Sequence, residues 1–253
     1  YRGQERALRH LMEIDPENAM DYRQQLVLAF LERGRAAEAR AVIRELLAKE
    51  GESDAVTYEF SAGIYALAGK PRDAARLYRR AYAAHPDRIE TLLLWANAMQ
   101  SQQRGAEAIG LFLDLIAQDV PDDLFLVAVD GLLNLSAGSE ALRFAERAVR
   151  RRIAASPDRV FLQRALQDVL EQLGDKDGRL AVLEETVLIA GQQRSAWLRE
   201  AMEEASQRKD WTRYLVHARS LLRSGEEVPP TVFVEMGEAL LAAKDLPGAE
   251  RAF

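Results

Sequence analysis

The stretch from Ala55 to Arg88, AVTYEFSAGIYALAGKPRDAARLYRRAYAAHPDR, decides the fold of this chain, because it reads as one complete helix–turn–helix repeat. Tyr58 and Tyr65 lie seven residues apart, the spacing of two turns on one helical face. Gly69 then interrupts the pattern, and Tyr78 belongs to a second apolar stripe. A helix pair this short cannot bury both stripes by itself. It requires neighbouring copies, as in a solenoid.

Small residues and prolines in this stretch predict how the two helices pack. Ala62 and Ala74 face each other in the expected pair, so the two backbones can approach closely. Pro71 fits the first turn of the second helix, where a missing N–H removes no hydrogen bond. Pro86 ends that helix. The sequence therefore predicts two short antiparallel helices.

The pattern returns along the whole chain at steps of about 34 residues. The turn column contains Gly34, Gly69, Gln103, Ser136, Gly174, Lys209 and Lys244. The column of the small residue between the helices contains Ala39, Ala74, Ala108, Ala141, Arg179, Tyr214 and Ala249. The next core column contains Ile43, Tyr78, Phe112, Ala145, Leu183, Ala218 and Phe253. This period predicts a chain of repeated helix pairs.

On these columns the chain resembles the tetratricopeptide repeat family. The resemblance is clearest in Tyr58, Ala62, Tyr65, Gly69, Ala74, Tyr78, Ala81 and Pro86, and again in Phe233, Met236, Gly237, Leu240, Ala249 and Phe253. It implies an all-α fold, a right-handed α-solenoid or superhelix of antiparallel helix pairs. Arg179 and Tyr214 depart from the family pattern, since they replace a small residue.

We expect a single superhelix of about seven repeats. The expected repeats cover residues 20–50, 55–86, 89–120, 122–155, 159–190, 195–224 and 231–253. Residues 1–14 fit only the second helix of a repeat, and the last repeat stops inside its second helix. We therefore expect a piece of a longer protein, cut through a repeat at both ends.

Composition narrows the classes of function. A formal net charge of −6 argues against general nucleic-acid binding, which requires a basic stripe. The absence of cysteine excludes disulfides and thiolate metal sites. No apolar run approaches the ~18 residues of a membrane helix, and no signal-peptide pattern is present. We expect no membrane span in this stretch of sequence.

Residues that carry chemistry are dispersed. His10, His85 and His217 fall in different repeats, and we expect His10 and His217 on outer helix faces. No phosphate loop, nucleophile elbow or HExxH motif occurs. We therefore predict no catalytic residue, no metal and no cofactor, and expect that the chain is not an enzyme.

Two kinds of charged cluster have structural explanations. The acid pairs Asp122–Asp123 and Glu226–Glu227 are expected in turns just ahead of helices, where acids favour the helix dipole. Arg150, Arg151 and Arg152 fall in the last turns of a long helix and complement its negative end. An acidic lipid or phosphate is the alternative ligand of this basic run.

The resemblance also implies a binding surface, because the first helix of each pair lines the concave side of such a superhelix. The polar positions expected on that groove are Asn97, Gln100, Asp130, Asn134, Arg164, Asp168, Glu171, Arg199, Glu200, Glu203, Glu235 and Glu238. Acids outnumber bases among them. We expect a partner with positive charge, either a basic protein surface or a cationic polysaccharide. A merely solvated face is the alternative.

Three functions fit these observations. The first is a non-catalytic scaffold that binds a partner protein in its groove, within a bacterial envelope assembly. The second follows from a resemblance to the periplasmic repeat region of bacterial exopolysaccharide (biofilm) exporters of the PelB-like kind, which would dock a modifying enzyme or guide a cationic polymer. The third is a regulatory module of an enzyme. The exporter reading implies a periplasmic location attached to an outer-membrane protein, and a cytoplasmic location is the alternative.

Overall fold

The computed structural model describes residues 2–49, 55–225 and 228–252. Every regular element within these residues is a helix. The contacts divide the chain into two compact units, an N-terminal unit (Tyr1–Gly131) and a C-terminal unit (Leu132–Phe253). The predicted all-α fold of sequential helix pairs is confirmed. The single superhelix across all seven repeats stays a prediction.

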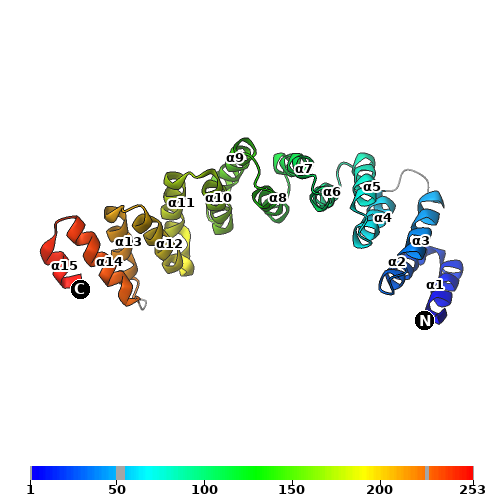
Figure 1. Ribbon diagram of the computed structural model, residues 1–253, viewed down its shortest axis with the longest axis horizontal. Helices are drawn as coiled ribbons and strands as arrows, with labels where there is room; N and C mark the ends of the chain where they lie inside the picture. Colours follow the sequence, from blue (N-terminus) through cyan, green and yellow to red (C-terminus); the bar gives the residue numbers. More distant parts are fainter. Residues whose placement is uncertain (1, 50–54, 226–227, 253) are drawn as a thin grey trace. The chain divides into compact units, whose positions relative to one another are not determined.

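In the N-terminal unit each helix from α1 to α7 packs on the next (Figure 1). Its elements are α1 (Arg2–Ile14), the 3-10 helix η1 (Pro16–Asn18), α2 (Ala19–Leu31), α3 (Ala36–Lys49), α4 (Ala55–Leu67), α5 (Pro71–Ala84), α6 (Ile89–Ser101), α7 (Gly105–Ala117) and the greater part of α8 (Asp122–Asn134). The even-numbered helices α2, α4, α6 and α8 are the first helices of their pairs.

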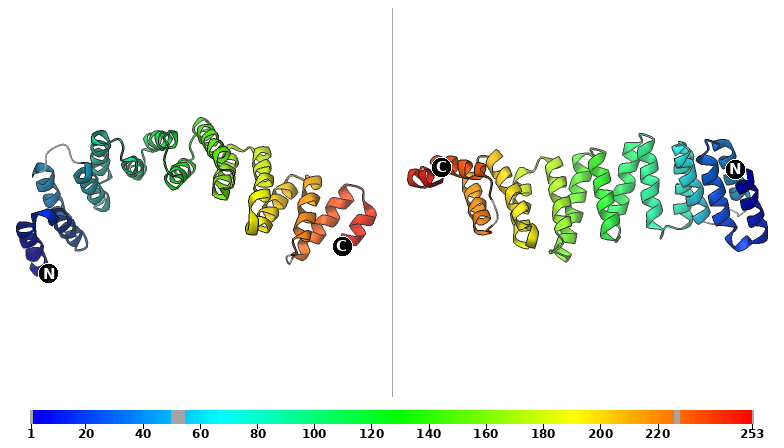
Figure 2. Two further views of the ribbon diagram at one scale, coloured as in Figure 1. Left: turned by 180° about the vertical axis from the view of Figure 1, so that it is seen from behind. Right: turned by 90° about the horizontal axis from the view of Figure 1, so that it is seen from below.

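The C-terminal unit continues the same arrangement in its own helices (Figure 2). After the end of α8 it contains α9 (Ser139–Ala155), α10 (Val160–Leu173), α11 (Lys176–Ile189), the 3-10 helix η2 (Gly191–Gln193), α12 (Arg194–Gln207), α13 (Trp211–Arg223), α14 (Pro230–Ala242) and α15 (Leu246–Ala252). The first helices here are α10, α12 and α14.

The turn column has one backbone conformation throughout. All seven predicted turn residues have positive φ, from 48° at Ser136 to 72° at Gly174. The amide after each of them donates to a carbonyl five residues back, as Lys70 N does to Tyr65 O at 2.8 Å. These bonds satisfy carbonyls that the helix end would otherwise leave without a donor. The predicted turn column is confirmed.

The core columns are buried in most repeats. Ala74 is fully buried, and Tyr78 and Phe112 are only 5% and 1% exposed. Tyr214, which departs from the family pattern, is also fully buried, so the core accepts a large side chain there. Arg179 is half-buried.

The core residue predicted for the fourth repeat is wrong by one position. Its second helix, α9, begins three residues after Ser136, whereas the other second helices begin two residues after their turn residue. One additional residue rotates the helix by about 100°. As a result Ala141, predicted in the core column, is only half-buried and Leu142 takes its place at 3% exposure.

Candidate partner-binding faces

Most exposed large apolar side chains of the N-terminal unit lie on the first helices of the pairs, and Ile14 at the end of α1 is the exception among the described residues. The large ones on α2, α4, α6 and α8 are Leu28, Val56, Leu67, Leu94 and Val127, between 40% and 73% exposed. Among the described side chains of the second helices α3, α5 and α7, no large apolar residue is exposed. The two faces of this unit therefore differ in chemistry.

The first helices α4, α6 and α8 contain no lysine or arginine, and their only charges are acidic. Glu59 of α4 is neutralised by Arg88, whose Nε donates to Glu59 Oε1 at 2.8 Å. Asp123 and Asp130 of α8 are exposed. Partial burial raises the pKa of the Asp130 carboxyl. The exposed face of these three helices is thus apolar and acidic.

Four of the predicted groove residues lie on α6 and α8. Asn97, Asp130 and Asn134 are exposed, and Gln100 is half-buried. The sequence interpretation selected these polar positions and did not consider the exposed apolar residues on the same helices. The sequence signal that could have indicated this face is the absence of Lys and Arg from three successive first helices.

The C-terminal unit uses two predicted groove residues to connect α10 with α12. Arg164 Nη1 and Nη2 each donate to a carboxylate oxygen of Glu200 at 2.7 Å. The Arg164 guanidinium also lies 4.0 Å from the centroid of the Trp197 ring. Glu200, predicted to be exposed, is half-buried because this pair covers it. Arg164 and Glu200 cancel each other's charge on this face.

A second ion pair, missed in the sequence, joins α11 and α12. Arg179 Nη1 donates to Glu204 Oε2 at 2.5 Å, and the Glu204 side chain is only 6% exposed. Arg179 Nη2 also lies 3.7 Å from a carboxylate oxygen of Glu171, another predicted groove residue. Arg179 therefore occupies a core column with its charge compensated. Its departure from the family pattern was the signal for a buried acid.

The remaining predicted groove residues of the C-terminal unit are Asp168 and Glu235, both half-buried, and Arg199, Glu203 and Glu238, all exposed. Burial, followed by a hydrogen bond with Glu235, strongly raises the pKa of the Tyr214 phenol. Glu235 thus faces the interior as well as solvent. The exposed acids on this face are fewer than the sequence predicted.

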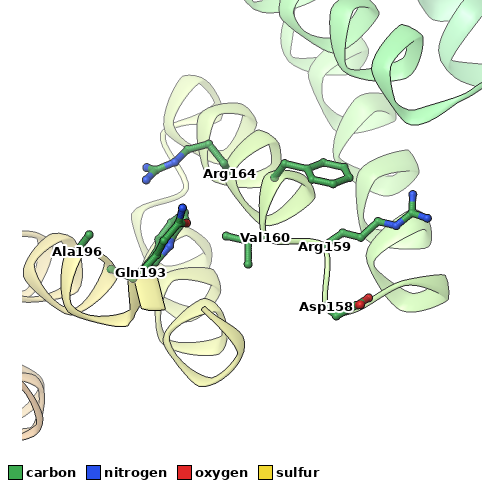
Figure 3. A pocket seen from close by; sticks show the side chains of 8 residues that line it. Asp158, Arg159, Val160, Arg164, Gln193 and Ala196 are labelled. Atoms are coloured by element: carbon green, nitrogen blue, oxygen red, sulfur yellow. The ribbon is translucent and has the colours of Figure 1, made fainter. Parts of the chain in front are cut away.

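An open pocket of about 720 Å³ lies beside the Arg164–Trp197 contact (Figure 3). Its lining residues are Asp158, Arg159, Val160, Phe161, Arg164, Gln193, Ala196 and Trp197. Phe161 is 45% exposed. Val160 lies between Arg164 and the Arg159–Asp158 loop in the close view. The pocket is suited to an apolar side chain bordered by polar groups.

The predicted outer position of His217 is wrong. His217, expected on an outer face, is buried, and its Nε2 lies 3.2 Å from Glu184 Oε1. The reason is that α13 turns this position toward Glu184 of α11, next to the core residue Ala218. His10 is exposed, as predicted. No group of three potential metal ligands occurs among the described residues.

The charged clusters have ordinary helix positions. Asp122 and Asp123 lie within the first turn of α8 rather than in the turn before it. Glu226 and Glu227 lie outside the described residues. Arg152 is in the last turn of α9, and Arg150 Nε donates to Glu146 at 2.9 Å. In the described part of the chain, no helix is both long and apolar enough to cross a membrane.

No family model and no curated protein matches the sequence. Solved structures do match its fold. A tetratricopeptide repeat protein from Parabacteroides merdae is 13% identical with a TM-score of 0.50, over 98% of this chain and 91% of that one. The C-terminal part of a repeat-containing protein from Cytophaga hutchinsonii is 13% identical with a TM-score of 0.53, over 90% and 92%.

A third match comes from a structure of Naa15/Naa10 bound to HypK-THB. It is 15% identical with a TM-score of 0.59, and covers 93% of this chain but 36% of the matched one. At these identities the likeness concerns the fold alone. The chain therefore has the helix-pair fold of tetratricopeptide repeat proteins, as the sequence resemblance implied.

Proposed function

We propose that this chain is a non-catalytic scaffold that binds a partner protein on the exposed face of its first helices. One observation carries the proposal: the exposed large apolar residues of α2 to α8 lie only on first helices among the described residues. Exposed apolar side chains gathered on one set of helices mark a candidate interaction site. A face without this role would carry the polar residues found on α5, such as Arg76 and Arg79.

The polar residues of the C-terminal unit support a structural role rather than chemistry. Arg164, Arg179 and His217 each have an acidic partner on another helix. Such pairs connect one helix to another and compensate the charges of Arg164 and Arg179. We assign them to packing within the scaffold.

More specific versions of the proposal differ in the chemistry of the partner and in the location of the protein. Exposed Glu203 and Glu238 are compatible with a basic partner or with a cationic polymer in an exopolysaccharide exporter. A periplasmic location belongs to that exporter form, and a regulatory module of an enzyme is the other form. Salt separates a charged partner from a neutral one, since the Debye length falls from about 10 Å at 0.1 M to about 3 Å at 1 M.

Site-specific photo-crosslinking in the source cells tests the proposal. A photoreactive residue replaces Leu94 on α6 in one variant and Arg79 on α5 in the matched control; both positions are exposed. We expect a discrete protein adduct from position 94 and none from position 79. Adducts from position 79 alone would contradict the assignment of the face.

A further inference from the structure

We infer that the exposed face of α4, α6 and α8 binds an amphipathic, cationic segment of a protein, with aliphatic side chains flanked by lysine or arginine. The inference rests on the proposed function and specifies the chemistry of the partner. It concerns only the N-terminal unit.

Apolar side chains recur at one position of the first helices α4, α6 and α8. Phe60, Leu94 and Val127 each lie nine residues before a turn residue of positive φ. Leu94 and Val127 are 40% and 44% exposed, and Phe60 is half-buried. Successive repeats thus present apolar groups at the same height on the face. Covering them stabilises a complex by about 25 cal/mol per Å² of apolar surface removed from water.

The charged residues on these helices are acidic. Glu90, Asp123 and Asp130 are exposed on α6 and α8, which contain no cationic residue. On α4, Glu59 is already neutralised by Arg88. A low-dielectric surface lined by charges of one sign focuses its field toward an incoming ligand. The ligand that gains from both features carries aliphatic and cationic groups together.

Other occupants fit less well. A second copy would bring the same acids opposite Asp123 and Asp130, and like charges oppose association. A cationic polysaccharide would satisfy the acids, but it has no aliphatic side chains to cover Leu94 and Val127. A nucleic acid would be repelled by the acids. A protein segment with a leucine-like face and lysines satisfies both requirements.

Three synthetic peptides of equal length test this chemistry by fluorescence anisotropy. One carries leucines on one face and lysines elsewhere, the second has glutamate in place of lysine, and the third has serine in place of leucine. In about 0.1 M salt, where the Debye length is about 10 Å, we expect the leucine–lysine peptide to bind the full chain at least about tenfold more tightly than either control, a difference of about 1.4 kcal/mol. Equal binding of the leucine–glutamate peptide would overturn the inference.

Matched variants locate the binding. Leu94→Ser combined with Val127→Ser, and separately Asp123→Asn combined with Asp130→Asn, should each weaken the leucine–lysine peptide several-fold. The control is Leu188→Ser combined with Val216→Ser, because these residues are 79% and 60% exposed on second helices of the C-terminal unit. Circular dichroism checks that each variant keeps its helices. A loss in the control as large as in the test variants would overturn the inference.

Two further outcomes separate this inference from the proposed function. If crosslinking at position 94 captures a protein while the leucine–lysine peptide does not bind, the partner chemistry is wrong and the scaffold function stands. A glucosamine oligosaccharide serves as the polymer probe. If it binds, loses affinity in the Asp123→Asn/Asp130→Asn variant and is unaffected by the Leu94→Ser/Val127→Ser variant, the face recognises a polymer and the inference is overturned.

Discussion

The first helices of the two units have the same backbone pattern but differ at one position that recurs along the chain. The position nine residues before the turn residue holds Phe60, Leu94 and Val127 in α4, α6 and α8, and Gln25 in α2. The same position holds Ala165, Glu200 and Glu235 in α10, α12 and α14. At this position Leu94 and Val127 are exposed apolar side chains, whereas Glu200 forms an ion pair with Arg164. At other positions the first helices of the C-terminal unit also expose apolar side chains, such as Phe161 and Val234.

This difference shows how a helix-pair repeat separates stability from recognition. The turn residues and core columns repeat because every pair needs them to pack on its neighbours. Exposed first-helix positions such as Leu94 and Val127 are not part of these columns. They can therefore change from repeat to repeat, and the face of each unit acquires its own chemistry.

The largest expected effect tests whether the cores of the two units lose similar amounts of stability when a buried tyrosine is truncated. Tyr78→Ala in the N-terminal unit and Tyr214→Ala in the C-terminal unit should each destabilise the protein by roughly 3–5 kcal/mol, since both side chains are buried. Urea unfolding measures the loss. The surface substitution Leu94→Ser should change stability by less than about 0.5 kcal/mol. An unchanged unfolding curve for either tyrosine variant would refute the core register.

The buried ion pair of the C-terminal unit gives the next largest effect. Arg179→Leu leaves Glu204 buried without a cation and should cost about 3 kcal/mol. Adding Glu204→Leu should restore most of that loss. The control in the N-terminal unit is Arg76→Leu, because Arg76 pairs with Asp73 at 3.1 Å on the surface. Exposed pairs contribute less than about 1 kcal/mol. Equal losses for the two arginines, measured by urea unfolding, would show that the C-terminal pair is not buried.

Tyr214 predicts a dependence on pH. Its folded-state pKa is raised, first by burial and then by Glu235, whereas an unfolded tyrosine ionises near pH 10. Above about pH 10 only the unfolded chain loses this proton, so stability should fall by about 1.4 kcal/mol per pH unit. Unfolding measured at pH 9, 10 and 11 should lose this slope in Tyr214→Phe. Parallel curves for the two proteins would contradict the assignment.

The smallest expected effect concerns the turns. Gln103 and Lys209 have φ of 60° and 57°, a conformation that costs most residues about 1–2 kcal/mol. Gln103→Gly and Lys209→Gly should each stabilise the protein by about 0.5–1 kcal/mol after the greater chain entropy of glycine is subtracted. Gly69→Ala should have the opposite sign, since Gly69 has φ of 66° and no atom near a new Cβ. Thermal unfolding of the three variants tests whether both units use one turn conformation.

The sequence by itself determined the helix pairs and the positions of the turns between their helices. These features depend on contacts a few residues apart: apolar spacing sets the helices, and Gly69 or Pro71 sets where they stop and start. The core columns of most repeats followed for the same reason. Ala141 was misplaced because one added residue in its turn rotates α9.

Only the tertiary structure decided which polar residues face one another. Arg164 and Glu200 are 36 residues apart, and Arg179 and Glu204 are 25 residues apart. Whether such residues meet depends on the rotation of each helix about its own axis, by about 100° per residue. A repeat period does not specify that rotation to the accuracy an ion pair needs. For the same reason the burial of His217 and the exposure of Leu94 and Val127 could be seen only once the helices were packed.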